Sequence, residues 1–91
     1  MEIIFPSTED ISFQGGNVVF EALVDGEPVG CLVTARALCA AAGVDNIIPR
    51  IEAFKIGRDT IHDVVTCILR RARTDRVVVT WAELAMSSRM N

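Results

Sequence analysis

The chain has 91 residues, of which 51% are hydrophobic and 23% are charged, and its formal net charge at pH 7 is −3. This composition is typical of one globular domain spanning residues 1–91 and excludes an intrinsically disordered chain. The longest apolar stretch is less than half of the ~18 residues that a membrane helix needs, so we expect no membrane-spanning segment.

The N-terminal part predicts two short strands. Residues 3–5 form a β-like run that ends at Pro6, which has no N–H to donate to a ladder and therefore suits a sheet edge. Residues 11–14 are a second candidate strand, followed by a glycine-rich turn at residues 15–17.

Apolar residues alternate on either side of Asp25 and Gly26, which predicts a β-hairpin. A two-residue turn pairs Val24 with Glu27, and a longer turn would shift the partners by two and leave both faces unchanged. One face is apolar throughout and carries Val18, Phe20, Ala22, Val24, Val29, Cys31 and Val33. The other face is mixed and carries Val19, Glu21, Leu23, Gly30 and Leu32.

Two helices are predicted after the hairpin. Thr34 is a good N-cap for a helix over residues 35–42, and Gly43 suits the left-handed position that ends it. A longer helix over about residues 48–73 follows. Its candidate N-terminal caps are Asp45 and Asn46.

The apolar side chains of the longer helix fall within one arc, made of Ile51, Phe54, Ile61, Val64, Val65, Ile68, Leu69 and Ala72. Gly57 lies inside this arc, where it would allow a kink or a close approach to the sheet. Arg58 lies at the edge of the arc. We expect its stem to lie along the core while its guanidinium forms a structural ion pair or, as the alternative, anchors an acidic partner.

Residues 76–81 predict a last strand, with Val77, Val79 and Trp81 on one face. The spacing from Thr80 to Glu83 matches a capping box and predicts a short helix over residues 82–86. The element order β-β-β-α-α-β then predicts an α+β fold, a mainly antiparallel sheet of about four strands with the helices packed on one face.

Three segments of the chain carry a resemblance to a known family. They are MEIIFP at the N-terminus, the hairpin VVFEALVDGEPVGCLVT with Ala37 and Leu38 after it, and the pattern made by Ala53, Phe54, Arg58 and Ile61. Together they resemble the small bacterial domain-of-unknown-function family 1488, which is uncharacterised. The resemblance implies a bacterial, cytoplasmic, single-domain protein, and it supplies no catalytic residues to carry over.

The cysteines and the N-terminus both indicate the cytoplasm. Cys31, Cys39 and Cys67 are odd in number and widely spaced, which fits neither a disulfide framework nor a zinc site and indicates reduced thiols. Glu2 and Pro6 interrupt any signal peptide.

The chain lacks the residue patterns that common enzyme and metal sites need. His62, the only histidine, cannot meet Cys67 on one helix, because a five-residue separation turns the two side chains about 140° apart. Asp59 and His62 have metal-pair spacing, but a single such pair favours a helix salt bridge. Gly15 and Gly16 have no phosphate-loop context. We therefore expect no enzyme, no catalytic residue, no cofactor and no metal.

Charge is unevenly distributed, since residues 1–30 carry six acids and no base while residues 31–91 carry nine bases and six acids. The basic cluster consists of Arg70, Arg71, Arg73 and Arg76. Cations at a helix C-terminus interact favourably with the helix dipole, which accounts for them. The alternative is an accessory nucleic-acid or anion-binding protein that uses this cluster, although the acidic pI near 5.0 argues against nucleic acid.

Apolar residues remain on the outer side of the sheet once the helices cover the other side. The N-terminal segments fold over this side, or it binds a partner; the sequence leaves both alternatives open. The patch alone cannot compel a dimer, because association itself costs about 4–15 kcal/mol. We interpret the protein as a non-enzymatic protein-interaction or structural module that binds an unknown protein or itself, as a homodimer. The candidate interaction residues are Val19, Leu23, Leu32, Arg58, Arg70, Arg71 and Arg73.

Overall fold

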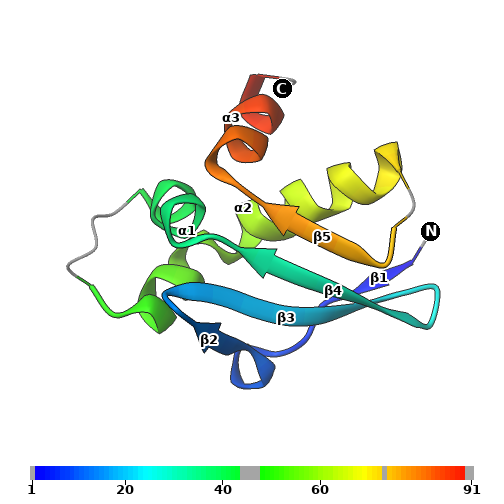
Figure 1. Cartoon of the computed structure of the whole chain (residues 1–91), viewed down its shortest axis with the longest axis horizontal. Helices are drawn as coiled ribbons and strands as arrows, with labels where there is room; N and C mark the ends of the chain where they lie inside the picture. The colour runs from blue at the N-terminus through cyan, green and yellow to red at the C-terminus, as the bar shows by residue number, and fades with distance from the viewer. Residues whose placement is uncertain (1, 44–47, 73, 90–91) are drawn as a thin grey trace.

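Helices cover one side of a mixed β-sheet in the computed structural model, which describes residues 2–43, 48–72 and 74–89 (Figure 1). The strands are β1 (Ile3–Ile4), β2 (Ser12–Gln14), β3 (Asn17–Val24), β4 (Glu27–Val33) and β5 (Arg76–Val79). The helices are a 3₁₀ turn (Thr8–Asp10), α1 (Ala35–Ala42), α2 (Arg50–Arg71) and α3 (Trp81–Arg89). The predicted α+β class is confirmed, and within the described residues the sheet has five strands.

The hairpin of β3 and β4 forms in the predicted register, with Val24 opposite Glu27. Asp25 and Gly26 have φ values of 52° and 85°, which is the left-handed pair that a type I′ turn needs and that matches the twist of the two strands. β5 runs parallel to β4 on its other side. This pairing is parallel because the chain crosses from β4 to β5 through α1 and α2.

Both N-terminal strands extend the sheet along the free edge of β3 and do not fold over its face. β1 pairs Ile4 with Leu23, and β2 pairs Ser12 with Val19. Two hydrogen bonds hold the first strand at the hairpin turn, since the Asp25 N–H donates to the Glu2 carbonyl at 2.8 Å and the Glu2 N–H donates to Asp25 Oδ1 at 2.9 Å. The alternative in which these segments cover the outer side is therefore wrong.

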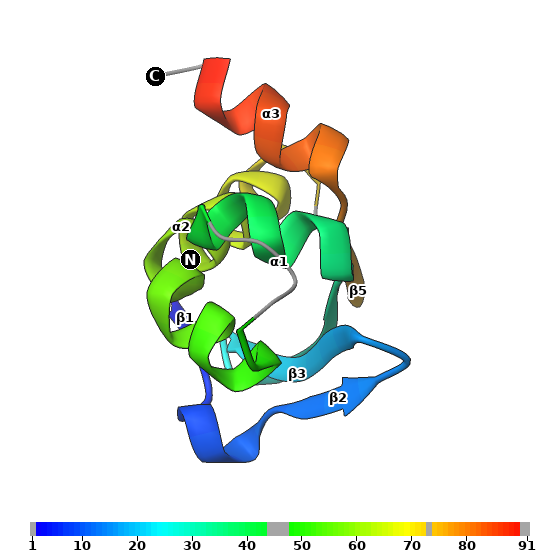
Figure 2. The same cartoon turned by 90° about the vertical axis from the view of Figure 1, so that its left-hand side faces the viewer.

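The core lies between the sheet and the helices α1 and α2 (Figure 2). Its sheet side consists of the apolar hairpin face predicted from the alternation, together with Val77 and Val79 of β5. Its helix side includes Phe54, whose ring meets that of Phe20 edge-on at 6.1 Å. Thr34 caps α1 by accepting from the Ala37 N–H at 3.2 Å.

α1 ends at Gly43, whose φ of 69° is left-handed as predicted. α2 begins at Arg50 and ends at Arg71, slightly inside the predicted bounds, and the proposed caps Asp45 and Asn46 lie outside the described residues.

Gly57 approaches α1 and not the sheet, which corrects the prediction. A Cβ at Gly57 would lie 2.9 Å from the backbone nitrogen of Ala42 and 3.0 Å from the carbonyl carbon of Ala41. The absent side chain therefore sets how closely the two helices pack.

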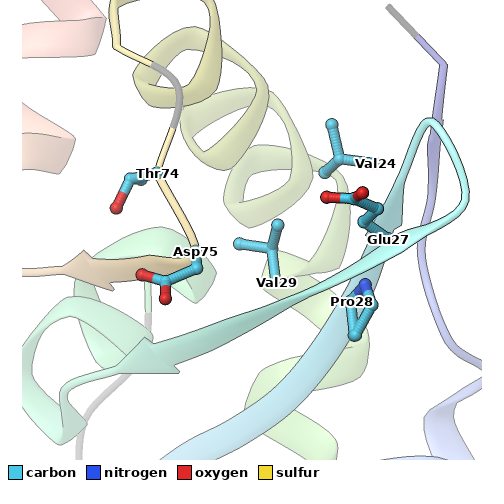
Figure 3. Close-up of a pocket in the computed structure, with 6 residues that line it drawn as sticks. All are labelled: Val24, Glu27, Pro28, Val29, Thr74 and Asp75. Atoms are coloured by element: carbon cyan, nitrogen blue, oxygen red, sulfur yellow. The ribbon is translucent and has the colours of Figure 1, made fainter.

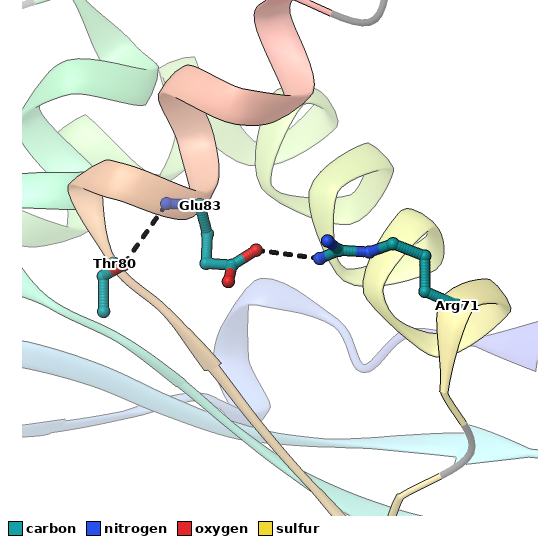
Figure 4. Close-up of polar contacts among 3 residues, drawn as sticks. All are labelled: Arg71, Thr80 and Glu83. Carbon is teal, nitrogen blue, oxygen red and sulfur yellow. Dashed lines mark hydrogen bonds and ion pairs between the residues drawn. The ribbon is translucent and has the colours of Figure 1, made fainter.

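The C-terminal helix starts earlier than predicted, because β5 ends at Val79 and Trp81 already belongs to α3. The Thr80 hydroxyl caps this helix by accepting from the Glu83 N–H at 3.3 Å (Figure 4). The Glu83 carboxylate accepts from the Arg71 guanidinium at 2.9 Å and so ties α3 to the end of α2. In the described part of the chain, none of the helices has the length and hydropathy that crossing a membrane requires.

Candidate interaction surface on the outer face of the sheet

The face of the sheet opposite α1 and α2 carries a mixed surface, which we call the outer face; Figure 1 looks onto it. The strand register assigns to it Ile4, Val19, Glu21, Leu23, Pro28, Gly30, Leu32, Arg76 and Val78. Within the described residues the helices pack on the other side, so this face stays bare (Figure 2).

Large apolar side chains are exposed on the outer face. The exposed fractions are 53% for Ile4, 41% for Leu23 and 46% for Val78, and Val19 and Leu32 on the same face are half-buried. The sequence predicted Val19, Leu23 and Leu32 at these positions and missed the other two. Val78 follows from the alternation of residues 76–79, since its neighbours on both sides are buried.

The strand register arranges the outer face in three rows that run across the strands. The middle row is polar, with Glu21 on β3, Gly30 on β4 and Arg76 on β5. One flanking row consists of Val19, Leu32 and Val78, and the other of Ile4, Leu23 and Pro28. A charged strip thus separates two apolar strips, with its negative end on β3 and its positive end on β5.

Two hollows in the described part of the outer face lie on either side of Glu21. One, of about 420 Å³, is lined by Val19, Gly30, Leu32 and Val78 among others. The other, of about 320 Å³, lies between β1 and β3 next to Ile4 and Leu23. The face is therefore not flat and can receive protruding side chains of a partner.

A third hollow, of about 260 Å³, lies at the end of the sheet beneath the hairpin turn (Figure 3). Glu27 and Asp75 bring two carboxylates to its rim. The Gly30 N–H donates to the Asp75 carbonyl at 3.0 Å and so links β4 to the segment before β5. The Thr74 hydroxyl donates to the Arg76 carbonyl at 3.1 Å within that segment. This hollow is thus part of the joint between β4 and β5.

The predicted arginine residues do not converge on one surface. Arg58 is exposed and forms an ion pair with its neighbour on the same helix, since its Nε lies 3.9 Å from the carboxylate of Asp59. Arg71 binds Glu83, whereas Arg76 belongs to the outer face. Arg70 is exposed on α2. Arg73 lies outside the described residues.

His62 is stacked on the ring of Phe5, with the ring centres 3.8 Å apart and the planes 4° from parallel. Burial lowers the pKa of His62, and the positive charge of Arg58 lowers it further, against the opposing effect of Asp59 and Asp63. His62 therefore helps to hold the segment after β1 against α2.

The cysteines occupy different environments. Cys31 is buried in the core, where burial raises its pKa to about 11, so the thiol is a poor nucleophile. Cys39 is half-buried and Cys67 is exposed. The hollows described above are not lined by Cys39 or His62.

Residues 3–79 match the profile of a family described as a protein of unknown function (DUF1488), and the chain belongs to this family. This is the family that the hairpin and the pattern around Phe54 and Arg58 resemble. No curated protein and no solved structure matches the chain.

Proposed function

We propose that this family member is a non-enzymatic protein-interaction module of the bacterial cytoplasm, and that its working surface is the outer face of the sheet. The observation that carries the proposal is that Ile4, Leu23 and Val78 are all exposed on one bare sheet face, in two apolar strips beside a charged strip. Exposed apolar surface rimmed by polar residues marks interaction sites.

The apolar strips and the charged strip have separate roles in this proposal. At about 25 cal/mol per Å², burying a few hundred Å² of the apolar strips contributes several kcal/mol. This gain is of the same order as the cost of association, about 4–15 kcal/mol. A partner must therefore also match Glu21 and Arg76, which set the orientation in which it binds.

The basic residues do not support nucleic-acid binding as a second function. Arg71 is engaged by Glu83 at the α2–α3 contact, and Arg76 lies on another surface from Arg70. A nucleic-acid site needs a continuous basic patch, because the affinity comes from several phosphate contacts made together.

The proposal is tested with lysine substitutions on the two sides of the molecule. Leu32→Lys and Val78→Lys put a charge into the outer face, and Ile56→Lys is the matched control at an exposed apolar residue of α2. Complexes are detected by sedimentation of the purified protein and by pull-down from lysate with identification of the bound protein. Circular dichroism confirms that each variant is folded.

We expect the complex to be lost in both outer-face variants and kept in Ile56→Lys. A complex that survives both Leu32→Lys and Val78→Lys would show that the partner binds elsewhere, and the proposed function would then be wrong.

A further inference from the structure

In the charged strip of the outer face, the two charged residues lie on opposite sides of β4, level with each other, and carry opposite charges. Glu21 is the direct neighbour of Gly30 on one side, and Arg76 is its direct neighbour on the other. Adjacent strands lie about 4.8 Å apart, so the two charged residues lie at equal distances from the line of β4. Gly30 leaves the space between them open.

This arrangement is self-complementary for one particular symmetry. A half-turn about an axis that runs parallel to β4, above the outer face, stacks two copies face to face and sets β3 of each over β5 of the other. Glu21 of each copy then lies over Arg76 of the other. An axis perpendicular to the strands would instead set Glu21 over Glu21 and Arg76 over Arg76, which like-charge repulsion disfavours.

The same half-turn also matches the neighbouring apolar row. Val19 of one copy lies over Val78 of the other, and Leu32 lies over Leu32. Stacked sheets pack about 10 Å apart, a gap that an extended glutamate and an extended arginine bridge together. Gly30 lies over Gly30, which leaves room for the two long side chains. The charged row and this apolar row thus give an apolar seal beside two ion pairs.

We propose that the partner of the outer face is a second copy of this chain, an inference that rests on the proposed function. The two copies stack face to face about a two-fold axis parallel to β4, and Glu21 of each copy pairs with Arg76 of the other. One sheet face is small beside the roughly 800 Å² per partner of a standard interface, so we expect a weak, concentration-dependent dimer.

The test exploits the two-fold symmetry. Glu21→Arg and Arg76→Glu each convert both ion pairs of a homodimer into like-charge contacts. In a heterodimer of the two variants, both pairs are opposite in charge again. Within each variant chain, residues 21 and 76 carry the same sign of charge. Mixing the two variants therefore restores opposite charges only between chains, and recovered dimers would show that the pairs form there. Glu52→Arg and Arg70→Glu, at exposed positions of α2, are controls with the same changes in net charge.

Sedimentation equilibrium measures the mass of each protein and of the equimolar mixture over a range of concentrations. We expect the wild type and both controls to dimerise, each outer-face variant to dimerise at least about tenfold more weakly, and the mixture to recover dimers. Added salt should weaken the wild-type dimer.

Two results would overturn the inference. A mixture that stays monomeric while the wild type dimerises would mean that the copies meet in another way, such as edge to edge through β5. If the wild type stays monomeric at all concentrations, the protein does not self-associate and the inference is wrong. In that case the proposed function is judged separately, by whether Leu32→Lys and Val78→Lys abolish binding of a different protein.

Discussion

The close contact between Gly57 and α1 predicts an unusual outcome for a glycine-to-alanine substitution. Inside an exposed helix, replacing glycine with alanine stabilises by about 1 kcal/mol, because alanine loses less backbone freedom on folding. At Gly57 the new Cβ would lie 2.9 Å from a backbone nitrogen of α1 and 3.0 Å from a backbone carbon. Backbone atoms cannot swing aside, so α1 and α2 must move apart.

The two effects have opposite signs, and the structure decides between them. Overpacking a well-filled core costs about 1–3 kcal/mol, and a collision with backbone belongs at the upper end of that range. The gain in helix propensity offsets about 1 kcal/mol. We therefore expect Gly57→Ala to lower the free energy of unfolding by about 2 kcal/mol. For a domain of this length the melting temperature should fall by about 8–16 °C.

Thermal unfolding followed by circular dichroism tests this expectation. Thr60→Ala, at an exposed position of the same helix, is the control and should change the melting temperature little. If Gly57→Ala melts at or above the wild-type temperature, helix propensity outweighs the contact, and the reasoning about α1 and α2 fails.

Two further predictions concern titratable groups. The pKa of His62 is lower in the folded state than in the unfolded state, where it is 6.5. The stability gained from its neutral form is therefore fully present above pH 6.5 and is lost as the pH falls through the lowered folded pKa. The melting temperature of the wild type should therefore fall more than that of His62→Gln between about pH 7.5 and pH 5, and parallel curves would contradict this. A thiol reagent at about pH 8 should label exposed Cys67 quickly and Cys31 only after unfolding, as read by mass spectrometry. Equal labelling rates in the native protein would show that Cys31 is not protected.

Local features of the chain were predictable because their causes lie within a few residues. The turn at Asp25 and Gly26 and the alternation beside it determine the register of β3 and β4. Thr34 and Gly43 bound α1 through hydrogen bonds and a left-handed φ that involve only adjacent turns. The same short-range reasoning found Val19, Leu23 and Leu32. Within one hairpin, successive side chains point to alternate faces, so the position of a residue along its strand is enough to assign its face.

The remaining features depend on which segments meet in space. β1 and β2 extend the sheet because the edge of β3 is free to pair with them. Ile4 lies on the outer face only because it pairs with Leu23. The helical arc showed that Gly57 is buried but not that its neighbour is α1. Arg71 is part of a basic run in the sequence, yet Glu83 of α3 engages it in the fold.

Four features follow from the order of the residues alone: the α+β class, the hairpin with its two faces, the helix boundaries to within a few residues, and the family. In contrast, the place of β5 beside β4, which completes the row from Glu21 through Gly30 to Arg76, depends on the packed fold. The face to which a residue points depends on its position within one strand. The neighbour across a strand instead depends on the packing of α1 and α2, which carry the chain from β4 to β5.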